Sequence, residues 1–128
     1  KVKAFRKNGN SITYSYFASR YDYLRISIAM LEDWNNNTCE GQYLKSLYEN
    51  KINKRRHMGI EGFNITTSYA GQFHTDIHGI EDRPIFVMDG FGGQSHVIDF
   101  EKNKIISIMA IHRDYNWKKI VINNLSKQ

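Results

Sequence analysis

A run of glycines in the second half of the chain has a spacing at which the backbone itself could do chemistry. The run, Gly90-Phe91-Gly92-Gly93-Gln94, lies between two strand-like stretches, Pro84 to Met88 and Ser95 to Phe100. A phosphate-binding loop needs glycines that lead into a helix, and no helical pattern follows Gln94. Glycines between paired strands mark a bulge or a close backbone approach, and N–H groups exposed there can stabilise an oxyanion. Spacing alone favours the structural bulge.

Three residues on one strand-like run have types that bind metals. His74, Asp76 and His78 occupy alternate positions, which places them on one face of a strand. Such positions are about 7 Å apart along the strand, so a shared ion would need ligands from another element. We therefore expect a solvated, hydrogen-bonded strand face and no metal site. His96 follows the glycine run closely enough to line a cleft, but strand alternation does not fix its direction.

Cys39 is the single cysteine, so the chain has no internal disulfide. It lies next to Glu40 in a polar, turn-rich stretch, and an adjacent acid disfavours the reactive thiolate. We expect no nucleophilic role for it.

The residues from Ile85 to Asp99 resemble the third-motif strand of serine β-lactamase-like hydrolases. This family also includes penicillin-binding proteins, class C β-lactamases, related esterases and 6-aminohexanoate-oligomer hydrolases. Its members carry Lys-Thr-Gly, or a His- or Trp-Gly-Gly variant, on the strand that borders the active site. Here the triplet falls on Met88-Asp89-Gly90. Met88 supplies neither the charge nor the hydrogen bond of Lys or His, so the resemblance is to the esterase and amide-hydrolase branch.

A second stretch resembles the same family. The residues from Ala18 to Arg25, followed by Ile28 to Leu31, are similar to one of its helices, and Gly41 to Leu47 is similar to the turn and helix that come next. The matches run in family order from about Ser15 to about Asp99. They imply an α+β fold in which helices flank an antiparallel sheet, as in the C-terminal part of the serine β-lactamase-like fold.

The family's nucleophilic motif, Ser-x-x-Lys, occurs nowhere in the chain. Tyr14-Ser15-Tyr16 has only a superficial likeness to the second family motif, and we interpret it as strand or loop. The resemblance therefore implies that residues 1–128 are a single partial domain, the C-terminal portion of a hydrolase domain. The nucleophilic serine, the lysine and the tyrosine would belong to an N-terminal portion outside this chain, and the chain alone is expected to be inactive.

The resemblance also implies roles for the residues of the glycine run. An upstream serine would attack an ester, amide or lactam carbonyl of a small molecule, and the Phe91 N–H would help to stabilise the oxyanion. Gly90 would admit the substrate, Phe91, Gly92 and Gly93 would shape the cleft floor, and Met88 and Asp89 would form its rim. Gln94 would support the loop, and neither metal nor cofactor is required. The alternative is a non-catalytic binding or structural α+β module, such as a degenerate hydrolase relative, which Met88 favours.

Hydrophobic periodicity predicts the elements that position this run. Ser19 and Asp22 form a capping-box pattern for a helix to about Trp34, which Asn35 to Asn37 end. A second helix is predicted from about Gln42 to Asn53. The apolar positions expected on one face are Leu24, Ile28 and Leu31 in the first helix, and Leu44, Leu47, Tyr48 and Ile52 in the second.

From Gly62 onward the period becomes two, which predicts an antiparallel sheet joined by short links. The predicted strands after a turn near Ala70-Gly71 are Phe73 to Ile77, Ile85 to Met88, Ser95 to Phe100 and Ile105 to Ile111, with a hairpin turn at Glu101 to Lys104. A closing helix from Trp117 to Leu125 would face the sheet with Trp117, Ile120, Val121 and Leu125.

Composition fits a globular domain, since 41% of the 128 residues are hydrophobic and no apolar run approaches the ~20 residues of a membrane span. The formal net charge is +5, but the basic residues are dispersed and no aromatic pattern typical of RNA binding accompanies them. We expect no nucleic-acid partner. The family resemblance is compatible with a periplasmic, secreted or cytoplasmic protein, so it leaves the compartment open.

Overall fold

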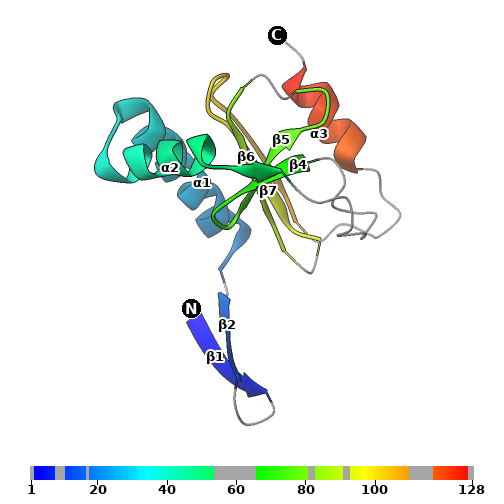
Figure 1. The fold of residues 1–128 in the computed structure, drawn as a ribbon. Helices are drawn as coiled ribbons and strands as arrows, with labels where there is room; N and C mark the ends of the chain where they lie inside the picture. Colours follow the sequence, from blue (N-terminus) through cyan, green and yellow to red (C-terminus); the bar gives the residue numbers. More distant parts are fainter. Residues whose placement is uncertain are drawn as a thin grey trace.

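The computed structural model describes residues 2–7, 11–16, 18–53, 66–80, 83–90, 93–109 and 117–126. Its main body is a six-stranded antiparallel sheet with helices on both faces (Figure 1). The α+β class expected from the sequence is therefore confirmed.

The six strands lie side by side in chain order. From β4 onward the connections between sequential strands are too short for a crossover and allow only antiparallel neighbours. The strands are β3 (Ile52–Asn53), β4 (Thr66–Ala70), β5 (Phe73–Ile77), β6 (Ile85–Asp89), β7 (Ser95–Asp99) and β8 (Lys104–Ile108). The turn predicted near Ala70-Gly71 is confirmed, and Gly71 there has a φ of +62°. The last strand ends at Ile108, earlier than predicted, and Ile111 lies outside the described residues.

Helix α1 (Arg20–Asn36) begins with the capping box that the sequence predicts. The Ser19 hydroxyl accepts a hydrogen bond from the Asp22 N–H, and the Asp22 carboxylate accepts one from the Ser19 N–H. The helix ends two residues later than predicted, because Asn37 is the residue that adopts the left-handed conformation, with a φ of 53°. Ile28, expected to face the core, is 40% exposed, and Ser27 is buried instead.

Helix α2 (Cys39–Glu49) begins after the Thr38 cap, so Cys39 is its exposed first residue rather than part of a turn. The predicted extension to Asn53 is wrong, since Asn50 ends the helix and the chain turns into β3. Ile52 consequently lies on an edge strand and is 66% exposed. Leu44 is buried, and Leu47 and Tyr48 pack against the same core, as predicted.

Helix α3 (Trp117–Leu125) lies on the opposite face of the sheet from α1 and α2 (Figure 1). Val121 and Leu125 are buried, as predicted, whereas Ile120 is 39% exposed, because the helix turns Ile122 and not Ile120 toward the sheet. Arg83 fastens the end of α3 to the sheet: its Nε donates to Asp99 Oδ2 at 2.8 Å and its Nη2 to the Leu125 carbonyl at 2.9 Å.

The sheet separates two hydrophobic cores, because successive side chains of a strand point to opposite faces. Phe86 and Ile98 belong to the core under α1 and α2, together with a group of aromatic rings: Trp34, Tyr48, Phe73 and Phe100. Val87 and Val97 belong to the core under α3, together with Ile77, Ile80, Ile85, Val121 and Leu125. All five residues of β7 and the first three of β6 are buried, so the two strands that flank the glycine run carry much of the core.

Strands β1 (Val2–Lys7) and β2 (Ser11–Tyr16) form a separate two-stranded antiparallel sheet that extends from the main body (Figure 1). Tyr14-Ser15-Tyr16 lies in β2, in agreement with its interpretation as strand or loop. Within the described part of the chain, no helix has the length and apolar character needed to cross a bilayer.

Candidate functional site

The glycine run forms the connection between β6 and β7. The Gly90 N–H donates to the Gln94 carbonyl at 2.8 Å, and the Gly93 N–H donates to the Gly90 carbonyl at 3.1 Å. Gly93 has a φ of +79°, a conformation that a residue with a side chain rarely adopts. These features are typical of a hairpin loop that has a left-handed residue before its second strand, so the turn itself requires a glycine at position 93.

Gly90 has a different reason to lack a side chain. A Cβ there would lie 2.7 Å from the Gln94 side-chain oxygen, so Gln94 occupies the space that Gly90 leaves. Gln94 thus packs into the loop and also accepts the Gly90 hydrogen bond through its carbonyl. Phe91 and Gly92 lie outside the described residues. The oxyanion donor at Phe91 and the cleft floor at Gly92 therefore remain predictions.

Met88 and Asp89 precede the loop and point to opposite faces of the sheet. Met88 is opposite His96 in the β6–β7 ladder and packs at the border of the core under α1 and α2. Asp89 is opposite Ser95. Asp89 Oδ1 and Ser95 Oγ are both buried, and neither has a hydrogen-bond partner in the described part of the protein. The base of the hairpin is therefore a buried polar position whose hydrogen-bonding groups the described residues leave unused.

His96 is directed toward α1, which settles the direction that the sequence left open. Its side chain is 2% exposed, its ring stacks on Tyr23 of α1 at a centroid distance of 4.8 Å, and its Nδ1 lies 2.9 Å from Ser107 Oγ. Burial lowers the pKa of His96, an effect that the negative charge of Asp89 opposes. The ring is consequently neutral near pH 7. Either Ser107 donates to Nδ1, or Nδ1 carries the proton and donates to Ser107.

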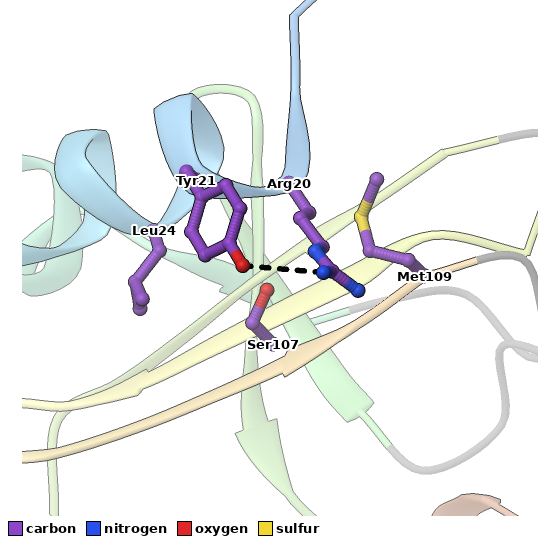
Figure 2. Close-up of a pocket in the computed structure, with 5 residues that line it drawn as sticks. All are labelled: Arg20, Tyr21, Leu24, Ser107 and Met109. Carbon is purple, nitrogen blue, oxygen red and sulfur yellow. Dashed lines mark hydrogen bonds between the residues drawn. The ribbon is translucent and has the colours of Figure 1, made fainter.

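A pocket opens beside this histidine, between the start of α1 and the end of β8. Its volume is about 320 Å³, and Figure 2 shows the five side chains that line it, Arg20, Tyr21, Leu24, Ser107 and Met109. The polar ends of Arg20, Tyr21 and Ser107 point toward one another, with Leu24 and Met109 on either side (Figure 2). Arg20 Nη2 donates to the Tyr21 hydroxyl at 3.2 Å. The pocket therefore combines one cation and two hydroxyl groups with apolar walls.

The register of the sheet brings the glycine hairpin and the pocket to the same end of the molecule. Asp89 is opposite Ser95, and Ser95 is opposite Ile108, so these residues form one row across β6, β7 and β8. Ser107 and Met109 lie on either side of this row and line the pocket. Ser107 also lies opposite His96, which lies opposite Met88. Of the predicted cleft residues, Met88 is thus two strands away from Ser107.

The possible metal ligands of β5 do not converge. Asp76 has a φ of 57°, which interrupts the alternation of the strand, and its carboxylate accepts hydrogen bonds from Lys51 at 2.6 Å and Tyr48 at 3.3 Å. His74 packs edge-on against Tyr69, and His78 is exposed. No cluster of three or more potential metal ligands occurs in the described ranges.

Sequence reasoning missed the pocket and the His96–Ser107 contact. Both depend on which residues of β7 and β8 are paired, and the pairing depends on the turn that joins them. A turn at residues 101–104 would pair Phe100 with Ile105, whereas the structure pairs Asp99 with Lys104. The actual register brings Ser107, rather than Met109, opposite His96.

Comparison with family models, with curated proteins and with solved structures gives no match for this chain.

Proposed function

We propose that this chain is the C-terminal portion of a serine hydrolase of the β-lactamase-like family, which cleaves an ester, amide or lactam bond in a small molecule. In this proposal the chain supplies the strand that borders the cleft, and the Ser-x-x-Lys nucleophile belongs to polypeptide outside residues 1–128. The branch of the family that lacks penicillin-type carboxylate recognition fits best, because Met88 occupies the position of the cationic residue.

The observation that carries the proposal is the position of the glycine hairpin. Gly90 to Gln94 joins β6 and β7, two interior strands of the antiparallel sheet, at the end where α1 begins and where the pocket opens. The capping box at Ser19 and Asp22 lies in the other stretch that resembles the family. The start of α1 and the β6–β7 hairpin, two segments far apart in the sequence that both resemble the family, thus lie at the same end of the molecule as the pocket.

The chemistry assigned to this chain is limited to the backbone of the hairpin and its surroundings. The Phe91 N–H would donate to the oxyanion that forms when the upstream serine attacks the carbonyl, and a donor of this kind contributes about 2.7 to 4 kcal/mol. Since Gln94 occupies the space next to Gly90, the substrate would approach the loop by displacing or contacting the Gln94 amide.

A non-catalytic binding module is the second candidate, and one specific observation favours it. The pocket itself contains a cation, two hydroxyl groups and apolar walls, which is sufficient for ligand binding without any reaction. In this alternative the glycine run is only a hairpin turn, which its hydrogen bonds also explain.

The test is the hydrolysis of p-nitrophenyl acetate by the natural full-length polypeptide and by its Gly90→Val variant. We expect the variant to fold and to lose hydrolysis, because the larger side chain would push Gln94 into the substrate position. Gly79→Ala is the control, since Gly79 has a φ of +85° and lies near the opposite end of β6. Full turnover by the folded Gly90→Val variant would remove the hairpin from the reaction and leave the binding module.

A further inference from the structure

The pocket between α1 and β8 contains a cation, Arg20, that no carboxylate of the described residues neutralises. Arg20 is exposed, and its recorded contacts are the hydroxyl and the ring of Tyr21, with the guanidinium carbon 4.9 Å from the ring centroid. In the described ranges of the chain it has no carboxylate partner. Arg25, one turn further along the same helix, pairs with Asp22 at 3.1 Å. Two arginines of one helix thus differ in whether a carboxylate balances their charge.

The position of Arg20 makes this difference informative. It is the first residue of α1, where the helix macrodipole favours acidic groups and disfavours a cation. A bound anion would offset this unfavourable interaction.

The two hydroxyl groups of the pocket can also act as donors. The Tyr21 hydroxyl oxygen accepts from Arg20, so its own hydrogen is free. Ser107 lies 2.9 Å from His96 Nδ1, and His96 Nε2 is buried without a partner in the described residues. If Nδ1 carries the proton, the buried Nε2 has only an unused lone pair. If Nε2 carried it, a buried N–H would have no acceptor, and buried unpaired N–H groups are the rarer of the two in proteins. His96 then donates to Ser107, and the Ser107 hydrogen points away from the ring.

From these contacts we infer that the pocket formed by Arg20, Tyr21, Leu24, Ser107 and Met109 binds a small organic carboxylate. The guanidinium and two hydroxyl hydrogens surround the carboxylate oxygens, and Leu24 and Met109 contact the apolar part of the ligand. A single cation matches a monoanion, and a volume of about 320 Å³ accommodates a ligand with few carbon atoms. Met88 of β6 cannot recognise such a charge. In this inference Arg20 of α1 recognises the anion instead.

The carboxylate site also narrows the substrate class of the proposed hydrolase to molecules that carry an acidic group. If the chain is part of a hydrolase, the acidic end of the substrate would bind in this pocket, because the sheet register brings the glycine hairpin and Ser107 to the same end of the molecule. This statement depends on the proposed function, whereas carboxylate binding does not.

Isothermal titration of the natural full-length polypeptide with benzoate, benzamide and inorganic phosphate tests the inference without any turnover. We expect saturable benzoate binding, and at least about tenfold weaker binding of uncharged benzamide, since charge-assisted hydrogen bonds are lost. Arg20→Gln should weaken benzoate binding by a similar factor. Arg25→Gln is the matched control and should stay within about twofold, because its charge is already paired and exposed.

Three results would overturn the inference: no saturable benzoate binding, equal binding of benzoate and benzamide, or Arg20→Gln binding like the wild type. Phosphate binding more tightly than benzoate would make the pocket an inorganic-anion site and would also contradict it. Two further outcomes distinguish this inference from the proposed function. Loss of hydrolysis in the Gly90→Val variant with unchanged benzoate binding would support both. Benzoate binding by a protein that hydrolyses nothing would support the carboxylate site and contradict the hydrolase.

Discussion

The Nδ1 atom of His96 lies 2.9 Å from the Ser107 hydroxyl, and this contact joins a buried ring to a surface pocket. The histidine belongs to a central strand whose five residues are all buried, whereas the serine lies on the outer strand of the described sheet and is exposed. Tyr23 covers the ring from α1. The first turns of α1 are thereby coupled to the interior of the sheet.

His96 should make folding stability depend on pH. Burial lowers the pKa of His96 from its ordinary value of 6.5, so below about that pH the unfolded chain binds more protons than the folded one. The free energy of unfolding should be unaffected by His96 above this value and fall as the pH drops toward the lower native pKa. Urea unfolding of the wild type and of His96→Gln at about pH 7.5 and about pH 5.5 measures the effect. An equal loss of stability in both proteins on acidification would show that His96 is not responsible.

Arg83 should be much more costly to remove than Arg25. Its side chain is 10% exposed and that of Asp99 is fully buried, so Arg83→Ala leaves an unpaired buried carboxylate and also frees the end of α3. Loss of one partner of a buried pair costs about 3 to 5 kcal/mol. Chemical denaturation measures the loss, with Arg25→Ala as the control for an exposed pair that should change little. Similar unfolding midpoints for the two variants would contradict this assignment.

Gly41 should not tolerate even one added methyl group. A Cβ at this position would overlap the Asp33 carbonyl, because α1 and α2 approach each other here through their backbones. We expect Gly41→Ala to lower the free energy of unfolding by about 3 kcal/mol, as overpacking typically does. At Gly79 a Cβ would have no neighbour within 4 Å. Gly79→Ala should therefore lower the free energy of unfolding by only about 1 to 2 kcal/mol, the cost of a left-handed conformation in a residue with a side chain. Thermal unfolding of both variants checks the order, and Gly41→Ala being the more stable of the two would be inconsistent with the helix contact.

The parts of the fold that local chemistry determines could be predicted. The Ser19 and Asp22 capping box, the β5 and β7 start points and the extent of α3 follow from caps, alternation and turn residues, all of which act over a few positions. The predictions failed where a distant contact decides the outcome. Ile28 and Ile120 have a helical spacing that suits the core, yet both are exposed once the helices pack on the sheet.

The candidate site was only partly predictable for the same reason. The glycine run could be placed between two strands, because glycine spacing and alternation are local signals. Arg20 and Ser107 are 87 positions apart, as the numbering shows, and only the sheet register and the packing of α1 bring them into one pocket. A shift of the β7–β8 turn by one residue would have placed a methionine opposite His96.

The central claim is that this chain borders a hydrolase cleft whose nucleophile belongs to other polypeptide. Labelling with a fluorophosphonate probe, followed by mapping of the modified peptide, tests it most directly when the natural full-length protein and the 128-residue chain are compared. The account predicts a single labelled serine outside these residues in the natural protein, and no specific label on the chain alone. A specific label on Ser107 or on any other serine of this chain, or no label on the natural protein, would contradict it.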